Sequence, residues 1–87
     1  MVTEFTTYTY NGHCAGWKFK YQDGSEYKHY KFSEDLIGTT VTETVTELGT
    51  HKFITGMNAY ESIQTASGTV STAYEFITTD STIMCGT

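Results

Sequence analysis

Alternation of apolar and polar side chains is clearest in the first third of the chain, where two short turn sequences interrupt it. Asn11-Gly12 and Asp23-Gly24 are residue pairs that two-residue β-hairpin loops favour, because such turns need a positive φ. The pattern therefore predicts a three-stranded antiparallel meander over residues 2–10, 13–22 and 25–32.

Two-residue loops also predict the register of this meander, with Tyr10 opposite His13 and Gln22 opposite Ser25. Counting back from these pairs places Trp17 and most of the other aromatic rings on one face, which we expect to be the core side. The opposite face is expected to be polar, basic and open to a partner. Its candidate partner-binding residues are Phe5, Lys18, Lys20, Tyr27, His29 and Lys31.

Two helices are expected after the meander. Over residues 33–49, apolar residues recur at helical spacing between a capping Ser33 and a terminating Gly49. The many threonines of this segment favour a strand instead, so pattern and propensity disagree, and the helical pattern is preferred here. A capping-box pattern at residues 58–61 predicts a second helix that ends near Gly68. Shorter strands are expected over residues 51–56, 69–78 and 82–85.

These elements predict one small α+β domain spanning residues 1–87. The meander would be extended by one or two later strands, and the two helices would cover its aromatic face. An all-β sandwich is the alternative, and it is supported by the aromatic content of 15% and by the abundance of threonine.

Composition narrows the classes of function. A chain of 87 residues has room for one thin core and little room for a deep substrate pocket. Ten acidic residues against five lysines and no arginine give a net charge of −5, which is the wrong sign for a protein whose main task is binding phosphate backbones. Nucleic acid is therefore a disfavoured partner.

The sequence carries no recognisable catalytic or metal-binding motif. Its histidines and cysteines include no close ligand pair of the kind that zinc sites use. It also has no nucleophile elbow and no glycine-rich phosphate loop. We therefore expect a non-enzymatic protein that uses no metal or other cofactor.

The first residues show neither the basic nor the apolar region of a signal peptide, and no apolar stretch approaches the ~18 residues of a membrane span. A cytoplasmic location without membrane association is the resulting expectation. In such a reducing compartment, Cys14 and Cys85 are expected to be free thiols more often than a disulfide. A disulfide between them would tie the end of the chain to the first hairpin.

Charge is distributed unevenly along the chain. Residues 1–32 carry a net charge of +1, whereas residues 33–87 carry −6. We hypothesise a protein that binds another protein, acting as an inhibitor or adaptor, as many small acidic phage-encoded inhibitors of host proteins do. The contact would use the basic sheet face or an acidic surface. The acidic candidates are Glu34, Asp35, Glu43, Glu47 and Glu61.

Two other classes of function stay open. The basic and aromatic sheet face could stack the bases of single-stranded nucleic acid, in which case binding would weaken as the salt concentration rises. A thin domain with threonine-rich strands could instead complete its core against a second copy, as a self-assembling structural subunit.

Overall fold

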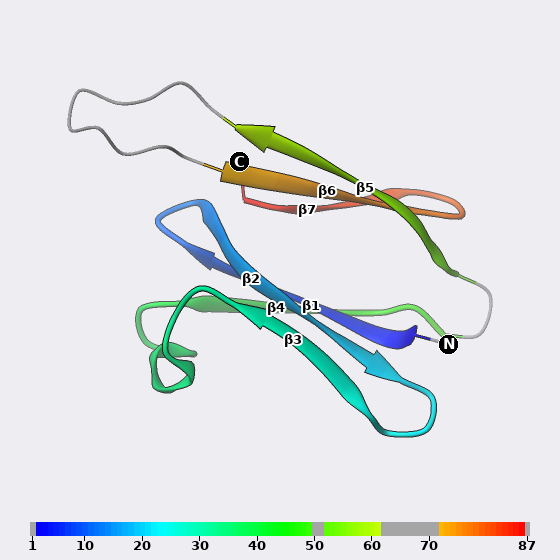
Figure 1. The fold of residues 1–87 in the computed structure, drawn as a ribbon, viewed down its shortest axis with the longest axis horizontal. Helices are drawn as coiled ribbons and strands as arrows, with labels where there is room; N and C mark the ends of the chain where they lie inside the picture. Colours follow the sequence, from blue (N-terminus) through cyan, green and yellow to red (C-terminus); the bar gives the residue numbers. More distant parts are fainter. Residues whose placement is uncertain (1, 50–51, 62–71, 87) are drawn as a thin grey trace.

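Strands make up most of the described chain, which comprises residues 2–49, 52–61 and 72–86 of a computed structural model. The first sheet has the spatial order β3-β2-β1-β4, with β1 (Val2–Tyr10), β2 (His13–Tyr21), β3 (Glu26–Tyr30) and β4 (Thr42–Glu47). The second sheet has the order β5-β6-β7, with β5 (Ile54–Glu61), β6 (Thr72–Thr78) and β7 (Thr82–Cys85). Neighbouring strands are antiparallel, and the two sheets lie one above the other (Figure 1).

The prediction of an α+β domain is wrong, and the alternative of an all-β sandwich agrees with the structure. Residues 33–49 form only one short 3-10 turn, η1 (Glu34–Leu36), before a chain reversal at Gly38 leads into β4. Residues 58–61 of the second predicted helix belong to β5, and residues 62–68 lie outside the described residues. Within the described ranges, no helix is long and apolar enough to cross a membrane.

The composition of β4 explains why this segment is a strand. Threonine stands at alternate positions 42, 44 and 46, and its branched side chain favours extended backbone. The apolar residues that suggested a helical stripe do not share one environment, because Val41 and Leu48 are buried while Val45 is 50% exposed. Pairing with β1 along the whole of β4 then stabilises the extended form.

The later strands lie close to their predicted positions. β7 occupies residues 82–85 as predicted, and β6 lies within the predicted range of 69–78. β5 begins inside the predicted range of 51–56 but continues to Glu61, through the segment that the capping-box pattern had assigned to a helix.

The predicted meander of β1, β2 and β3 is confirmed, but the register between β2 and β3 differs by one residue. At the turn between them, Gly24 N donates to Tyr21 O (3.0 Å) and Tyr21 N donates to Ser25 O (2.8 Å), so the loop has three residues instead of two. Gly24 has a φ of 90° and occupies the left-handed position of such a loop. As a result, Trp17 pairs with His29, one position away from its predicted partner.

The first hairpin also departs from the predicted register. The Asn11-Gly12 turn forms with positive φ at both residues, as expected. Further along β2, Ala15 is an extra residue in a β-bulge, and beyond it Tyr8 pairs with Gly16. A shift of one residue exchanges the two faces of a strand relative to its neighbour. Phe5 and Thr7 of β1 therefore stand opposite Phe19 and Trp17 and face the core, whereas Tyr8 does not. Val2, which lies before a second register shift, also packs against the core.

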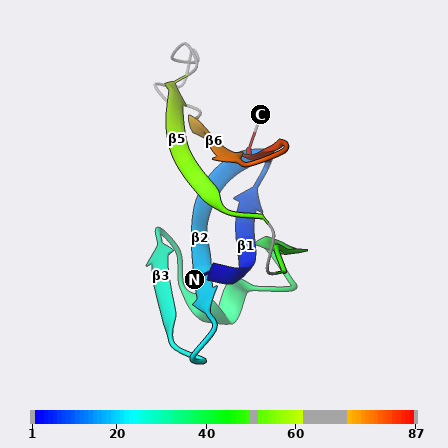
Figure 2. The same ribbon diagram turned by 90° about the vertical axis from the view of Figure 1, so that its right-hand side faces the viewer.

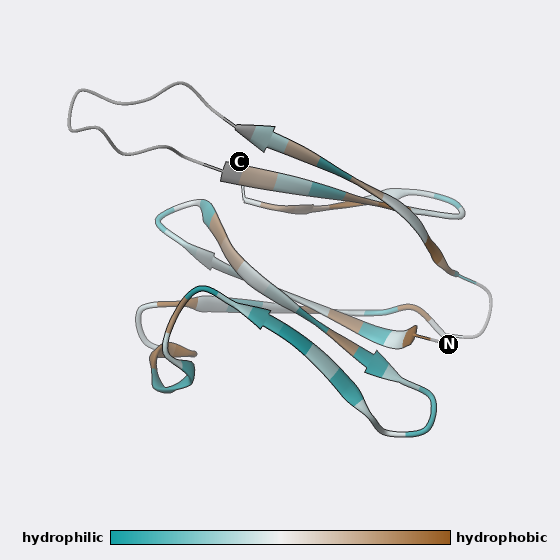
Figure 3. Cartoon of the chain, in the orientation of Figure 1, coloured by the Kyte–Doolittle hydropathy of each residue, from teal (hydrophilic) through white to brown (hydrophobic). Residues whose placement is uncertain are grey.

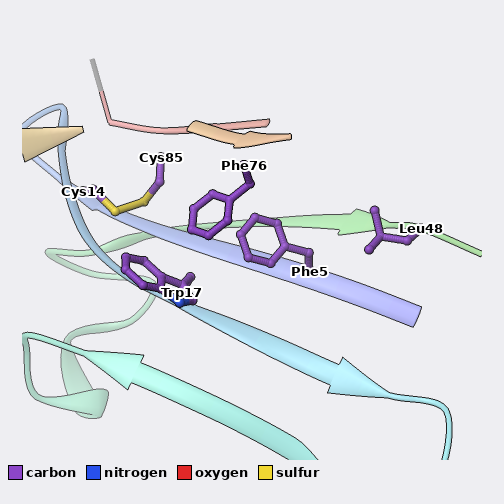
Figure 4. Packing of buried hydrophobic residues seen from close by; sticks show 6 residues of the cluster. All are labelled: Phe5, Cys14, Trp17, Leu48, Phe76 and Cys85. Carbon is purple, nitrogen blue, oxygen red and sulfur yellow. A yellow bond between two sulfur atoms is a disulfide. The ribbon is translucent and has the colours of Figure 1, made fainter. Parts of the chain in front are cut away.

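The main core lies between the two sheets (Figure 4). Phe5 of β1 and Phe76 of β6 are 0% and 1% exposed, and their ring centroids are 4.5 Å apart. Trp17 of β2 packs against Phe76 at 5.2 Å. Hydrophobic and hydrophilic residues alternate along β2 and β5 (Figure 3), as expected where each sheet has one buried face.

A disulfide between Cys14 and Cys85 joins β2 to β7 across this core (Figure 4). The expectation of free thiols is therefore wrong. Both cysteines are buried, at 7% and 0% exposure, and their Cα atoms are 5.0 Å apart. The two positions are distant in sequence, and packing of the sheets brings them together.

Candidate functional site

The six predicted partner-binding residues do not share one face. Phe5 is completely buried in the core. Tyr27 and His29 stand opposite the core residues Phe19 and Trp17, so both lie on the inner face of the first sheet, which faces the second sheet. Lys31 also reaches toward the second sheet, with Nζ 5.9 Å from the ring centroid of Tyr74 in β6. Lys18 and Lys20 lie on the outer face.

Four side chains of the inner faces form what we call the β3–β5 margin: Tyr27, His29, Met57 and Tyr74. Packing between the sheets is centred on β2 against β6 and β7. β3 and β5 are the sheet edges on the same side of the molecule (Figure 2). Tyr27 and Met57 are consequently 52% and 51% exposed, although their strand positions point into the sandwich.

The margin has a rigid aromatic base. His29 stacks on Trp17, with ring centroids 4.6 Å apart, and Tyr74 meets the same indole edge-on at 5.0 Å. Tyr27 stacks on Phe19 at 6.1 Å. Fixed rings with one free surface lose little conformational entropy on binding, which is why aromatic residues are frequent in protein interfaces.

β5 forms the outer edge of the second sheet beside the margin. From residue 54 to residue 60 it carries no charged side chain and no proline, the residue types that usually protect an edge strand. Glu75 of β6 accepts hydrogen bonds from Asn58 Nδ2 (3.1 Å) and Tyr60 Oη (3.2 Å) on the outer face. The hydrogen bond to Glu75 raises the pKa of Tyr60. These hydrogen bonds help to hold β5 against β6. Among the described residues, no strand pairs with the other side of β5.

The acidic candidates are spread over several elements. Glu34 and Asp35 lie in η1, Glu43 and Glu47 lie on β4, and Glu61 ends β5 in the other sheet. Glu34 forms an ion pair with Lys28, in which Oε1 and Nζ are 3.6 Å apart. The structure therefore does not gather these five residues into one surface.

Tyr8 is buried on the outer face of the first sheet, whereas the register predicted from two-residue loops would place it on the same face as Trp17. Its Oη lies 3.2 Å from Tyr30 Oη. Burial, together with hydrogen bonds to Tyr30 and Glu43, raises the pKa of Tyr8. The phenol therefore stays protonated near neutral pH.

A pocket of about 440 Å³ lies where the β1–β2 hairpin meets the connection from β3 to β4, and we call it the hairpin pocket. Its apolar wall includes Phe32, Leu36 and Val41, and Lys31 and His13 also line it. Sequence reasoning had found Lys31 but not this pocket, because the pocket is created by the chain reversal in a segment predicted to be helical.

The described residues contain no group of three or more His, Cys, Asp or Glu side chains that could hold a metal ion. In the comparisons with known proteins, no family model, no curated protein and no solved structure matches this chain.

Proposed function

We propose that this chain is a non-catalytic domain that binds another protein through the β3–β5 margin. The observation that carries the proposal is the exposure of Tyr27 and Met57, two large side chains on inner faces, at 52% and 51%. Monomeric domains normally bury such positions, and exposed apolar residues grouped at one place are typical of interaction sites.

Strand addition to β5 is the mode of binding that this edge supports. Among the described residues the first sheet has four strands and the second has three, and β5 is an edge strand of the second sheet beside which a fourth strand could be added. An extended segment placed there would gain main-chain hydrogen bonds from β5, and its alternate side chains would cover Met57 and Tyr27. The preferred partner segment is extended and has apolar residues at every second position.

A partner segment that is bound to β5 cannot bind other proteins at the same time. This is how an inhibitor acts, and an adaptor could hold its partner by the same contact. The disulfide between Cys14 and Cys85 favours an oxidising compartment over the cytoplasm that the sequence had suggested. The proposed partner is therefore a protein that this chain meets in such a compartment.

Two observations argue against the alternative of nucleic-acid binding through the outer face. Lys18 pairs with Glu26 and Lys28 pairs with Glu34, each at 3.6 Å, which reduces the positive charge of this face. The net charge of −5 opposes approach to phosphates.

The test compares two double variants of the oxidised protein. Tyr27→Glu/Met57→Glu places charges at the margin, whereas Val45→Glu/Met84→Glu places them at residues of similar exposure, 50% and 48%, outside it. Each tagged protein is used to capture partners from the source material and is examined by sedimentation.

We expect a partner that the wild type and the Val45/Met84 control bind, and that the margin variant loses at least about 10-fold in affinity, as for an interface hot spot. Equal capture by the margin variant would refute the proposal. Loss of a homodimer in the margin variant alone would identify a second copy of this chain as the occupant of β5.

A further inference from the structure

A further inference concerns the hairpin pocket, which shares no lining residue with the β3–β5 margin. The β1–β2 turn and the connection containing η1 lie at the same end of the first sheet (Figure 1). The chain reversal at Gly38, where Gly38 N donates to Val41 O (2.9 Å), holds the connection in place. The volume of about 440 Å³ falls in the range of pockets that take small organic ligands.

The walls of the pocket are fixed by contacts outside it. Phe32 packs against Tyr8 at 5.3 Å and against Tyr30 at 4.9 Å between ring centroids. Val41 is 2% exposed, and Cys14 is held by its disulfide to β7. A pocket whose walls are already in place does not have to be ordered when a ligand binds.

Lys31 brings a positive charge to the pocket. Its lining includes Lys31 and His13 and no aspartate or glutamate. Within the described residues, Lys18, Lys28 and Lys52 each pair with a carboxylate, whereas Lys31 and Lys20 do not. The Lys31 ammonium instead lies 5.9 Å from the Tyr74 ring, a contact that is weak at an exposed site and that a carboxylate can replace.

We propose that the hairpin pocket binds a small monocarboxylic acid with an apolar chain. The carboxylate would lie at Lys31, and the chain would lie against Phe32, Leu36 and Val41. An apolar wall with a cationic residue beside it selects a molecule that has both parts, because an uncharged chain leaves the ammonium unpaired and a cationic one is repelled by it.

The test uses octanoate, 1-octanol and octylamine, which share a chain length and differ in charge. Binding is measured by titration calorimetry, and its place is identified from amide shifts in NMR spectra of the oxidised protein. We expect octanoate to bind about 10-fold more tightly than octanol, and octylamine to bind more weakly than either. The amide shifts should centre on the residues of the pocket wall.

Two charge variants decide whether Lys31 is responsible. Lys31→Met should weaken octanoate binding about 10-fold and leave octanol binding unchanged. Lys20→Met removes a positive charge from the outer face instead, and it should change neither octanoate binding nor octanol binding. The proposal is overturned if octanoate does not bind, if both variants weaken it equally, if octanol or octylamine binds as tightly, or if the shifts lie away from the pocket.

Discussion

At the scale of single residues, Gly16 shows how closely the strands of the first sheet approach. A β-carbon added at this position would lie 2.3 Å from the carbonyl oxygen of His29, and 3.1 Å from the Cα of Tyr30. These are backbone atoms, which cannot turn away as the end of a side chain can. Only glycine fits at this position, directly after the bulge at Ala15.

We therefore expect Gly16→Ala to lower the free energy of unfolding by about 3 kcal/mol, at the upper end of the cost of overpacking. Gly24→Ala is the matched control, because Gly24 has a left-handed φ of 90° but open space around it. The free energy of unfolding of the Gly24→Ala control should fall by only about 1 kcal/mol. Denaturant unfolding of both variants measures the difference, and a smaller loss for Gly16→Ala would contradict the close approach.

At the scale of elements, β4 is an edge strand of the first sheet, and it places one negative charge opposite another on β1. Glu47 stands directly opposite Glu4 of β1, which in turn stands opposite Lys20 of β2. Like charges opposite each other on one face destabilise a strand pair. The charge of Glu4 is thus repelled by Glu47 on β4 and attracted by Lys20 on β2.

Replacing Glu47 by lysine should stabilise the protein by about 0.5–1 kcal/mol, because it changes the repulsion with Glu4 into an attraction. Glu47→Gln removes only the repulsion and should give about half of that gain. Thermal unfolding at low salt measures both, and the gain should shrink as salt is added. A destabilised lysine variant would show that Glu4 and Glu47 are not cross-strand neighbours.

At the scale of the whole molecule, the disulfide and one aromatic cluster hold the two sheets together. Phe76 of β6 contacts rings from β1 and β2, while Cys85 of β7 is bonded to Cys14 of β2. The bond closes a loop between residues 71 positions apart. A constraint across so long a loop removes much of the conformational freedom of the unfolded chain.

Removing this bond in the double variant Cys14→Ala/Cys85→Ala should lower the free energy of unfolding by about 4 kcal/mol. A reductant should destabilise the wild type by a similar amount and leave the double variant unchanged. Denaturant unfolding with and without reductant measures both effects. Two free thiols titrated in the unreduced, unfolded wild type would contradict the disulfide itself.

The candidate sites also belong to the scale of the whole molecule. Sequence reasoning found Tyr27, His29 and Lys31, because they stand out as aromatic and basic residues on one strand. It placed the buried Phe5 beside them and could not find Met57, which comes from the other sheet. The error at Phe5 follows from the register of the first sheet, and Met57 was missed because its place depends on the packing of the second sheet on the first.

The sequence by itself determined the positions of the first two turns, the three strands they join and the last strand, because glycine geometry and residue alternation act locally. The sequence also predicted that the Trp17 face of β2 is buried, but only the structure shows which side chains of β1 and β3 share that face, since a three-residue loop and the bulge at Ala15 shift the pairing by one residue. Tertiary structure also decided that residues 42–47 form a strand, because pairing with β1 supplies hydrogen bonds that local propensity does not include. The disulfide depends on the same packing, which brings together two cysteines at opposite ends of the chain.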